Sequence, residues 1–268
     1  MIFQPALDAL ASVLFAAPCR ICDAPLLNAS RIPICRTCLA SFAELHGLLC
    51  PCCGRPQTSA SIQQSGIAQS PPTTETAPIS TPPLCRLCRA KTFAFVRARN
   101  WAAYNESLTA AIMLLKYEEV TRLGDWFAAR LVELHARLSQ ADGAAWRADA
   151  VVPVPLHADR RRERGYNQVD MIARPLAKRL KLPFRPYLLA RTKPRPARLV
   201  LSRSEHWESV RGAYAIREGS RVDKLRILLV DDVMTTGATL DACSRALLAA
   251  GATEVVAITV ARAIPHQG

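Results

Sequence analysis

One stretch of this chain decides its fold: residues 227–240 run Ile227-Leu228-Leu229-Val230-Asp231-Asp232-Val233-Met234-Thr235-Thr236-Gly237-Ala238-Thr239-Leu240. The four apolar residues at its start predict a strand that is buried on both faces of a parallel sheet and that ends at the two acids. The spacing of apolar residues from Leu240 to Ala250 predicts a helix. A strand, a loop and a helix in this order place the loop at the carboxyl edge of a parallel sheet, where ligands bind.

The loop between the predicted strand and helix has the residues of an anion site. Gly237 lets the backbone approach a ligand closely, and amides that open a helix favour an anion. Threonine hydroxyls beside such amides suit a phosphate monoester, while Asp231 and Asp232 suit the vicinal hydroxyls of a sugar or a hydrated Mg²⁺. Phosphate, ribose diol and magnesium together suggest phosphoribosyl pyrophosphate (PRPP) as the ligand.

The same stretch resembles the PRPP-binding motif of type I phosphoribosyltransferases, in which an apolar run, two acids and a short spacer precede T-T-G-A-T. The resemblance implies that Asp231 and Asp232 are catalytic. It implies that PRPP is bound by Val233, Thr235, Thr236, Gly237, Ala238 and Thr239. One alternative is an ordinary strand-to-helix turn with surface acids. Another is a response-regulator receiver, which needs several more strand–helix units after its acids; with Gly268 as the last residue, we do not expect one.

The positive charge of the chain is concentrated in one block. The formal net charge is +13, and residues 160–203 hold fourteen lysines and arginines against two acids. Such a block beside a predicted phosphate site favours an anionic substrate or a nucleic acid. A solvated cationic face is the alternative that we prefer for most of these arginines.

The sequence does not predict insertion into a membrane. No uncharged stretch reaches transmembrane length, and the apolar N-terminus has no basic residue before Arg20, unlike a signal peptide. We interpret Ala6 to Phe15 as a short amphipathic helix that packs on the fold, and we expect a cytoplasmic protein.

Nine of the ten cysteines fall before Arg89, mostly as C-x-x-C pairs. This spacing is typical of zinc ribbons, in which two short turns bring four thiolates to one tetrahedral ion. The sequence therefore predicts about two structural Zn²⁺ sites, the first formed by Cys19, Cys22, Cys35 and Cys38 and the second by Cys50, Cys53, Cys85 and Cys88. Cys52 can replace Cys53 as a ligand, and a disulfide framework is the alternative that a secreted chain would favour. We interpret Cys243 as a core residue.

The predicted domains meet near residue 92. Residues 1–92 are expected to form a double zinc ribbon with a low-complexity insert at 58–83, which is rich in Ser, Thr, Pro and Gln. Residues 93–268 are expected to form a Rossmann-type α/β domain with a parallel sheet. Its predicted elements are a strand at 93–104, helices at 106–117 and 123–138, a strand at 148–157, an arginine-rich loop at 160–168 and a helix at 169–180.

The order of the motifs resembles the ComF family: paired C-x-x-C turns, then L-K-Y, V-P-V-P-L-H, R-G-Y-N-Q and V-D-D-V-M-T-T-G-A-T. That family consists of double-zinc-ribbon, phosphoribosyltransferase-like proteins linked to DNA uptake in competent bacteria. The resemblance implies a pyrophosphate loop from Pro155 to Gln168, with Lys116 near the active site. The implied pyrophosphate residues are Lys116, Pro155, His157, Arg160, Arg164, Gly165, Asn167 and Gln168.

One segment departs from the family. Where its flexible catalytic loop usually has a glutamine, an arginine and an asparagine, this chain has Arg198, His206 and Ser209, which leaves the acceptor open. We expect a phosphoribosyltransferase that binds PRPP, or another phosphorylated ribose, with Mg²⁺ and that carries structural Zn²⁺. The alternative is a non-catalytic, zinc-containing competence factor that binds single-stranded DNA or proteins of the competence machinery.

Overall fold

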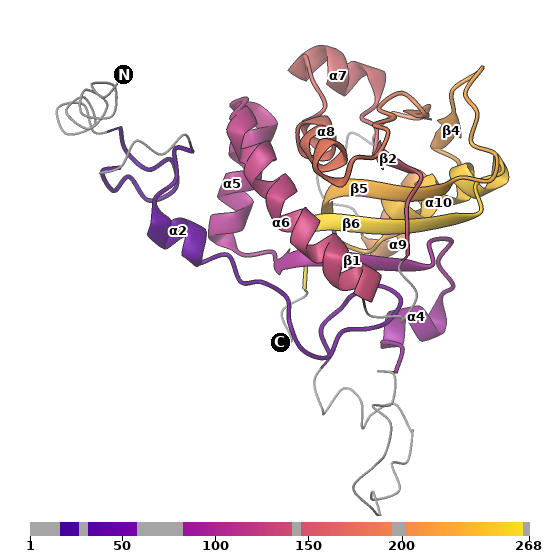
Figure 1. The fold of residues 1–268 in the computed structure, drawn as a ribbon, viewed down its shortest axis with the longest axis horizontal. Coiled ribbons are helices and arrows are strands. Elements are labelled where there is room, and N and C mark those ends of the chain that lie inside the picture. Colours follow the sequence, from indigo (N-terminus) through magenta and orange to yellow (C-terminus); the bar gives the residue numbers. More distant parts are fainter. Residues whose placement is uncertain (1–16, 27–31, 58–82, 141–145, 195–201, 265–268) are drawn as a thin grey trace, which may run out of the picture.

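A four-stranded parallel sheet forms the centre of the computed structural model, which describes residues 17–26, 32–57, 83–140, 146–194 and 202–264 (Figure 1). Its strand order is β1 (Arg97–Ala103), β6 (Glu254–Arg262), β5 (Arg226–Met234) and β2 (Ala150–Pro153). All three neighbouring pairs are parallel. The parallel α/β fold predicted from the sequence is therefore confirmed.

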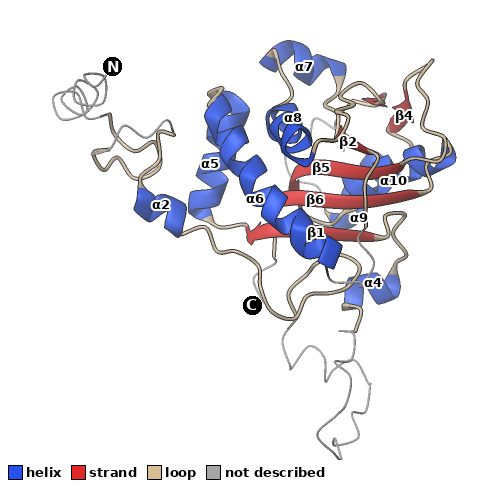
Figure 2. Ribbon diagram, viewed as in Figure 1, coloured by secondary structure: helices blue, strands red, loops and turns tan. Residues whose placement is uncertain are grey.

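Helices cover both faces of this sheet (Figure 2). One face carries α5 (Glu106–Tyr117), α6 (Thr121–Gln140) and α8 (Gln168–Leu180), and the other carries α9 (Arg203–Val210) and α10 (Ala238–Ala249). The apolar run of β5 is divided between the two layers. Leu228 and Val230 belong to the core under α5, α6 and α8, whereas Ile227 and Leu229 belong to the core under α10. This division explains why the run lacks polar alternation.

Local sequence signals fix the ends of several helices. Asn105 caps α5 by accepting a hydrogen bond from the Leu108 amide at 2.8 Å, and Ser202 and Glu205 form a capping box at α9. The helix α5 has the predicted bounds at both ends. Gly124 lets α6 approach α8 closely, because a Cβ there would lie 2.5 Å from the Met171 carbonyl oxygen.

The shorter elements lie around this frame. They are α2 (Arg36–Ala40), α4 (Arg86–Ala90), α7 (Ala158–Arg164), and the antiparallel pair β3 (Leu189–Arg191) and β4 (Tyr214–Ile216). The helix α7 corrects a prediction, because residues 160–168 were expected to form a loop. His157 caps its start by accepting the Asp159 amide, and Gly165 ends it in the left-handed region at φ 77°. Glycine adopts that conformation without strain.

The strands also differ in length from the predictions. β1 and β2 are shorter than expected, whereas β5 continues through both acids to Met234. Pairing with β6 explains this extension, since Val233 lies opposite Ala261 and Met234 opposite Arg262. The predicted helix at 6–15 and the insert at 58–83, except Pro83, lie outside the described residues. No helix among the described residues is long and apolar enough to cross a membrane.

Candidate functional site

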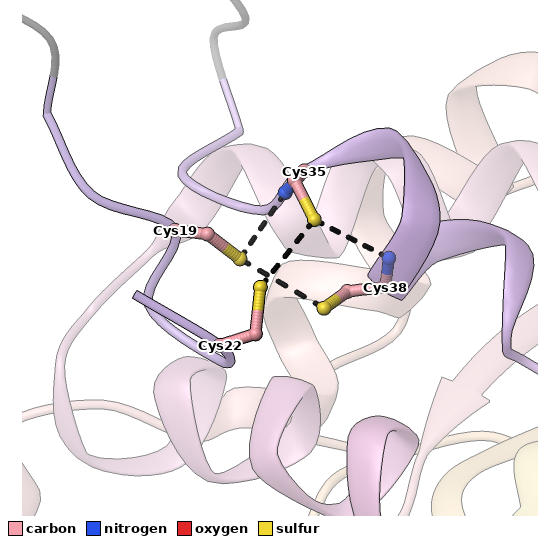
Figure 3. Close-up of side chains that lie close together, drawn as sticks. All are labelled: Cys19, Cys22, Cys35 and Cys38. Atoms are coloured by element: carbon pink, nitrogen blue, oxygen red, sulfur yellow. Dashed lines mark hydrogen bonds between the residues drawn. The ribbon is translucent and has the colours of Figure 1, made fainter. Parts of the chain in front are cut away.

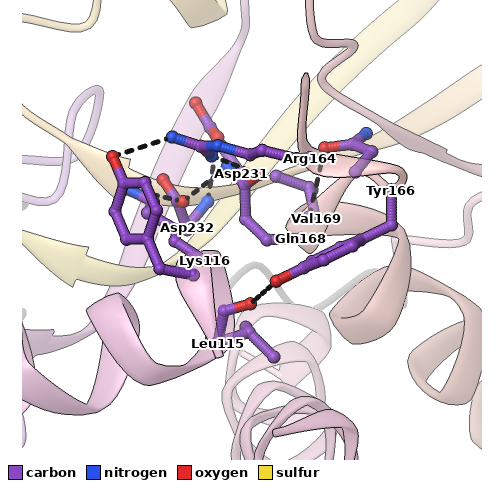
Figure 4. A network of polar contacts seen from close by, with 10 residues as sticks. Leu115, Lys116, Arg164, Tyr166, Gln168, Val169, Asp231 and Asp232 are labelled. Atoms are coloured by element: carbon purple, nitrogen blue, oxygen red, sulfur yellow. Dashed lines mark hydrogen bonds and ion pairs between the residues drawn. The ribbon is translucent and has the colours of Figure 1, made fainter. Parts of the chain in front are cut away.

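The two neighbouring acids of β5 have different surroundings. Asp232 accepts the Lys116 ammonium at 2.9 Å and the Gln168 side-chain amide at 3.0 Å, both through Oδ2 (Figure 4). Asp231 accepts the Asp232 backbone amide at 2.9 Å. We predicted that both acids reach one ligand because the strand ends at them. The strand instead continues to Met234, and successive side chains of a strand, here Asp231 and Asp232, point to opposite faces of the sheet.

The two acids also differ in their electrostatic environments. Burial alone would lower the pKa of Lys116, but the Asp232 carboxylate outweighs burial and the pKa is raised. Lys116 is therefore a half-buried cation held by the buried Asp232, and their side chains are 20% and 8% exposed. Burial raises the pKa of Asp231 well above its ordinary value, and the neighbouring charge of Asp232 raises it further. Asp232 is the acid with a cationic partner.

Asp231→Asn is expected to stabilise the protein increasingly as the pH rises. Because burial raises the folded-state pKa of Asp231, ionisation of its carboxyl destabilises the fold by an amount that grows as the pH rises from the unfolded pKa of about 3.9 to the folded pKa and is constant above it. Asparagine has no proton to lose. In urea unfolding at a series of pH values, the gain in unfolding free energy should be smallest near pH 4, grow with pH and then become constant.

Asp125→Asn provides a control with the opposite sign. Arg179 lowers the pKa of Asp125, so the stability that this carboxylate contributes is present above its unfolded pKa and is lost as the pH falls through the folded value. The two variants should deviate from the parent protein in opposite directions above pH of about 4. Deviations of the same sign would contradict the assigned environment of Asp231.

Arg164 extends the network around Asp232. It donates to Gln168 Oε1 at 3.1 Å and to the Tyr117 hydroxyl at 2.9 Å, and its guanidinium lies 4.6 Å from the centre of the Tyr117 ring. Arg160, four residues earlier, instead pairs with Glu163 and has a side chain that is 47% exposed. Among the predicted pyrophosphate residues, Lys116, Arg164 and Gln168 therefore form one network with Asp232, and Arg160 does not join it.

The remaining predicted pyrophosphate residues act locally in the structure. Asn167 caps α8 through the Val169 amide and donates to the Val154 carbonyl at 3.1 Å. His157 caps α7, Gly165 ends it, and Pro155 is buried. Sequence reasoning missed two tyrosines: Tyr117 contacts Arg164, and Tyr166 donates to the Leu115 carbonyl at 2.9 Å. Both lie within the motifs L-K-Y and R-G-Y-N-Q, which provided the available signal.

The threonine-rich loop connects β5 to α10. Gly237 adopts φ 84°, and a Cβ there would lie 2.8 Å from the Met234 methyl and 2.9 Å from the Phe93 ring, so only glycine fits. Thr236 Oγ1 accepts the Ala238 amide at 3.2 Å and lies 3.4 Å from His206 Nδ1. Thr235 is exposed, Thr236 and Thr239 are half-buried, and Val233 packs on the core. We call residues 235–239 the phosphate loop.

A cavity lies between the phosphate loop and helix α9. The predicted catalytic-loop residues His206 and Ser209 lie on α9, whereas Arg198 lies outside the described residues. The cavity has a volume of about 320 Å³ and is lined by Arg55, Leu87, Ser204, Trp207, Thr235, Thr236, Ala263 and Ile264. Sequence reasoning did not predict it, because its walls come from segments far apart in the chain.

The eight predicted zinc ligands gather into two groups. Cys19, Cys22, Cys35 and Cys38 form the first quartet (Figure 3), and Cys50, Cys53, Cys85 and Cys88 form the second; within each quartet all sulfur atoms lie within 4.8 Å of one another. Three of these sulfur pairs, Cys19–Cys38, Cys22–Cys35 and Cys53–Cys85, are 3.6–3.9 Å apart. Tetrahedral Zn–S bonds of about 2.3 Å place sulfur atoms about 3.8 Å apart. Both quartets can therefore hold zinc.

Two further details agree with the cysteine predictions. The second quartet contains Cys53 and not Cys52, which is half-buried beside it. Cys243 lies fully buried in the core under α10. All ten cysteines are free thiols in the structure, which does not favour the disulfide alternative.

Comparison with known proteins shows which family the chain resembles. Residues 171–266 match the family described as phosphoribosyl transferase domain. Competence protein F of Haemophilus influenzae is 30% identical over 60% of this chain and 70% of its own length. DNA utilization protein YhgH of Escherichia coli K12 is 27% identical over 88% of this chain and 93% of its own. Competence protein ComFC of Bacillus subtilis is 24% identical over 85% and 84%.

Two solved structures also resemble part of this chain. Glutamine PRPP amidotransferase from B. subtilis is 25% identical with a TM-score of 0.32, over 51% of this chain and 26% of its own, so the chain spans about a quarter of that enzyme. Adenine phosphoribosyltransferase from Leishmania tarentolae is 18% identical with a TM-score of 0.30, over 60% and 76%. The family match and the curated relatives, together with the parallel sheet, show that this chain belongs to the ComF family and has its phosphoribosyltransferase-like fold.

Proposed function

We propose that this protein binds PRPP with Mg²⁺ and transfers the phosphoribosyl group to an acceptor. The observation that carries the proposal is the network in which Lys116 and Gln168 contact Asp232 and Arg164 donates to Gln168. It provides two cations and a carboxylate at the carboxyl end of β5, next to the phosphate loop. A sugar that carries anionic groups at both ends matches that distribution of charge.

Each part of the network has a role in the proposed reaction. The amides and hydroxyls of the phosphate loop would hold the 5′-phosphate. Asp232 would accept the ribose hydroxyls and stabilise the positive charge that develops on the sugar. Lys116 and Arg164 would neutralise the departing pyrophosphate as the bond at the anomeric carbon breaks. The Asp232 carboxylate is a suitable oxygen ligand for Mg²⁺, which would supply further neutralisation of the pyrophosphate.

The cavity beside the phosphate loop is our candidate for the acceptor site. Thr235 and Thr236 belong to both, so an occupant would lie next to a ligand on the loop. The Arg55 Nε atom is buried and has no hydrogen-bond partner in the structure.

Arg164→Ala is expected to weaken binding of PRPP by about ten- to a hundredfold and to affect ribose 5-phosphate much less. The lost interaction is a charge-assisted hydrogen bond, worth about 1.5–3 kcal/mol, and only PRPP carries the pyrophosphate. Arg160→Ala is the matched control, since Arg160 lies outside the network and should leave both affinities unchanged. Calorimetric titration of both ligands into the three proteins measures this. Equal weakening of both ligands by the two substitutions would show a general electrostatic effect and overturn the assignment.

A second function rests on a different observation. The helix α7 presents arginines that are 47% and 78% exposed, Arg160 and Arg162, and two curated relatives are named for competence and for DNA utilization. A nucleic acid would contact such residues through its phosphates. Binding of single-stranded DNA across a salt series would support this function if affinity falls steeply with salt and if Arg160→Ala with Arg162→Ala removes it.

A further inference from the structure

Arg262 is a fully buried cation at the last position of β6. Its side chain is 0% exposed and is among the largest fully buried ones. Nη1 donates to the Cys53 carbonyl oxygen at 3.2 Å, Nη2 lies 3.8 Å from Cys53 Sγ, and Nε has no partner. Among the described residues, no carboxylate forms an ion pair with this guanidinium. An arginine is rarely buried in this way without a negative partner.

The second quartet is the source of negative charge at Arg262. The guanidinium of Arg262 lies 3.8 Å from the Sγ atom and 3.2 Å from the carbonyl oxygen of Cys53, which is a member of this quartet. Bringing an ion out of water costs several kcal/mol unless an opposite charge compensates it. Four thiolates around one divalent ion retain an excess of negative charge. Arg262 therefore has a compensating charge only if the quartet is ionised, as it is when it holds a metal.

We propose that Arg262 is the counter-charge of the second quartet and that it fixes the metal centre to the end of β6 that supports the phosphate loop. Arg262 lies opposite Met234 in the sheet, and the amide of Ala263, the next residue, donates to the Met234 carbonyl at 3.0 Å. Met234 directly precedes the phosphate loop, and its methyl group lies against Gly237. Arg262 and Met234 thus connect Cys53 of the second quartet to the start of the phosphate loop. The part that concerns the loop rests on the proposed function.

A buried polar network makes the same connection between the quartet and the sheet. The Cys53 carbonyl also accepts the Asn100 side-chain amide at 3.3 Å, and Asn100 accepts the Thr259 hydroxyl at 2.8 Å. Asn100 lies on β1 and Thr259 on β6, and both are buried. One carbonyl of the second quartet therefore receives donors from two strands of the sheet. The second quartet is built into the α/β core, and Arg262 is its charged contact.

The test compares metal release from the full-length protein with and without Arg262. In a Cys22→Ser background, which removes a ligand of the first quartet, the remaining zinc would be that of the second. Its release to a chromophoric chelator is measured for Arg262→Met, Arg262→Lys and the control Arg226→Met, whose arginine pairs with Asp149 at the opposite end of β5. Loss of an outer-shell partner of a metal ligand typically weakens metal binding by about 10- to 100-fold.

We expect about 10- to 100-fold faster release for Arg262→Met, a smaller change for Arg262→Lys and none for Arg226→Met. Arg262→Lys keeps the charge but replaces the two nitrogens that contact Cys53 with one, so its smaller acceleration serves as the readout if Arg262→Met does not fold. Equal release from the parent protein, Arg262→Met and Arg262→Lys would overturn the proposal. A Cys22→Ser protein that contains no metal would instead refute the predicted zinc site, which is a different failure.

The connection to the phosphate loop has its own readout. The affinity for ribose 5-phosphate should fall in Arg262→Met and remain unchanged in Arg226→Met. Unchanged affinity in an Arg262→Met protein that releases metal faster would overturn the connection to the loop. A parent protein that does not bind ribose 5-phosphate would refute the proposed function, which makes the two failures distinguishable.

Discussion

Asp232→Asn is expected to lower the affinity for PRPP by about ten- to more than a hundredfold. The substitution keeps the shape of the side chain and removes its charge. Two effects add: the ribose loses a charge-assisted hydrogen bond, worth about 1.5–3 kcal/mol, and Lys116 loses the carboxylate that holds it at 2.9 Å. A half-buried lysine without its partner no longer has a fixed position for the pyrophosphate. Calorimetric titration of PRPP with Mg²⁺ into the variant gives the measurement.

Asp231→Asn is the control for this substitution. Asp231 has the same side chain on the neighbouring residue, but it has no cation within ion-pair distance among the residues that the structure describes, and its pKa is raised by burial. Its replacement should weaken PRPP binding much less than Asp232→Asn. An equal loss in both variants would show that both acids contact the ligand, as the sequence alone suggested. A larger loss for Asp231→Asn would reverse the assignment of the two acids.

Cys53→Ser is expected to remove one of two zinc ions and to unfold the α/β core. The Cys53 carbonyl accepts hydrogen bonds from Asn100 on β1 and from Arg262 on β6, so a metal bound by this quartet would stabilise the central sheet. Metal binding to a structural zinc site is worth on the order of 10 kcal/mol, which is comparable to the whole stability of a domain. Elemental analysis of the purified protein and circular dichroism measure the two effects.

Two further cysteine variants make this prediction specific. Cys52→Ser changes the neighbouring cysteine, which is not in the quartet, and should retain both metal ions and the fold. Cys22→Ser removes an exposed ligand of the first quartet and should cost one metal ion while the sheet remains folded. Loss of zinc in Cys52→Ser but not in Cys53→Ser would show that Cys52, and not Cys53, is the zinc ligand. A parent protein with no zinc would refute both sites.

The central unit of the fold was predictable because its signals are local. The apolar run before Asp231, the glycine at 237 and the helical spacing after Leu240 each reflect a backbone preference that neighbouring residues decide. The helix at 106–117 was predicted with its observed ends from the helical spacing of its apolar residues, and in the structure Asn105 caps its start. The C-x-x-C spacing similarly identified all eight residues of the two quartets, since short turns determine which thiolates converge.

The parts that were not predictable depend on contacts between distant residues. The extension of β5 beyond Asp232 follows from its register with β6. The choice of Arg164 over Arg160 depends on which turn of α7 faces Gln168 and Tyr117, and an arginine-rich run contains no signal for that. The contact of His206 with Thr236 joins residues 30 positions apart. The division of the chain into domains at residue 92 and the roles of the individual site residues stay predictions.

Titration of PRPP into the purified, zinc-loaded protein, with and without Mg²⁺, tests the central claim most directly. We predict saturable binding of one PRPP per chain that is tighter with Mg²⁺ and is weakened at least tenfold by Asp232→Asn. Ribose 5-phosphate should compete with PRPP for the phosphate loop. Absence of PRPP binding to the folded protein, or binding that Asp232→Asn leaves unchanged, would contradict the claim that this site is a phosphoribosyltransferase site.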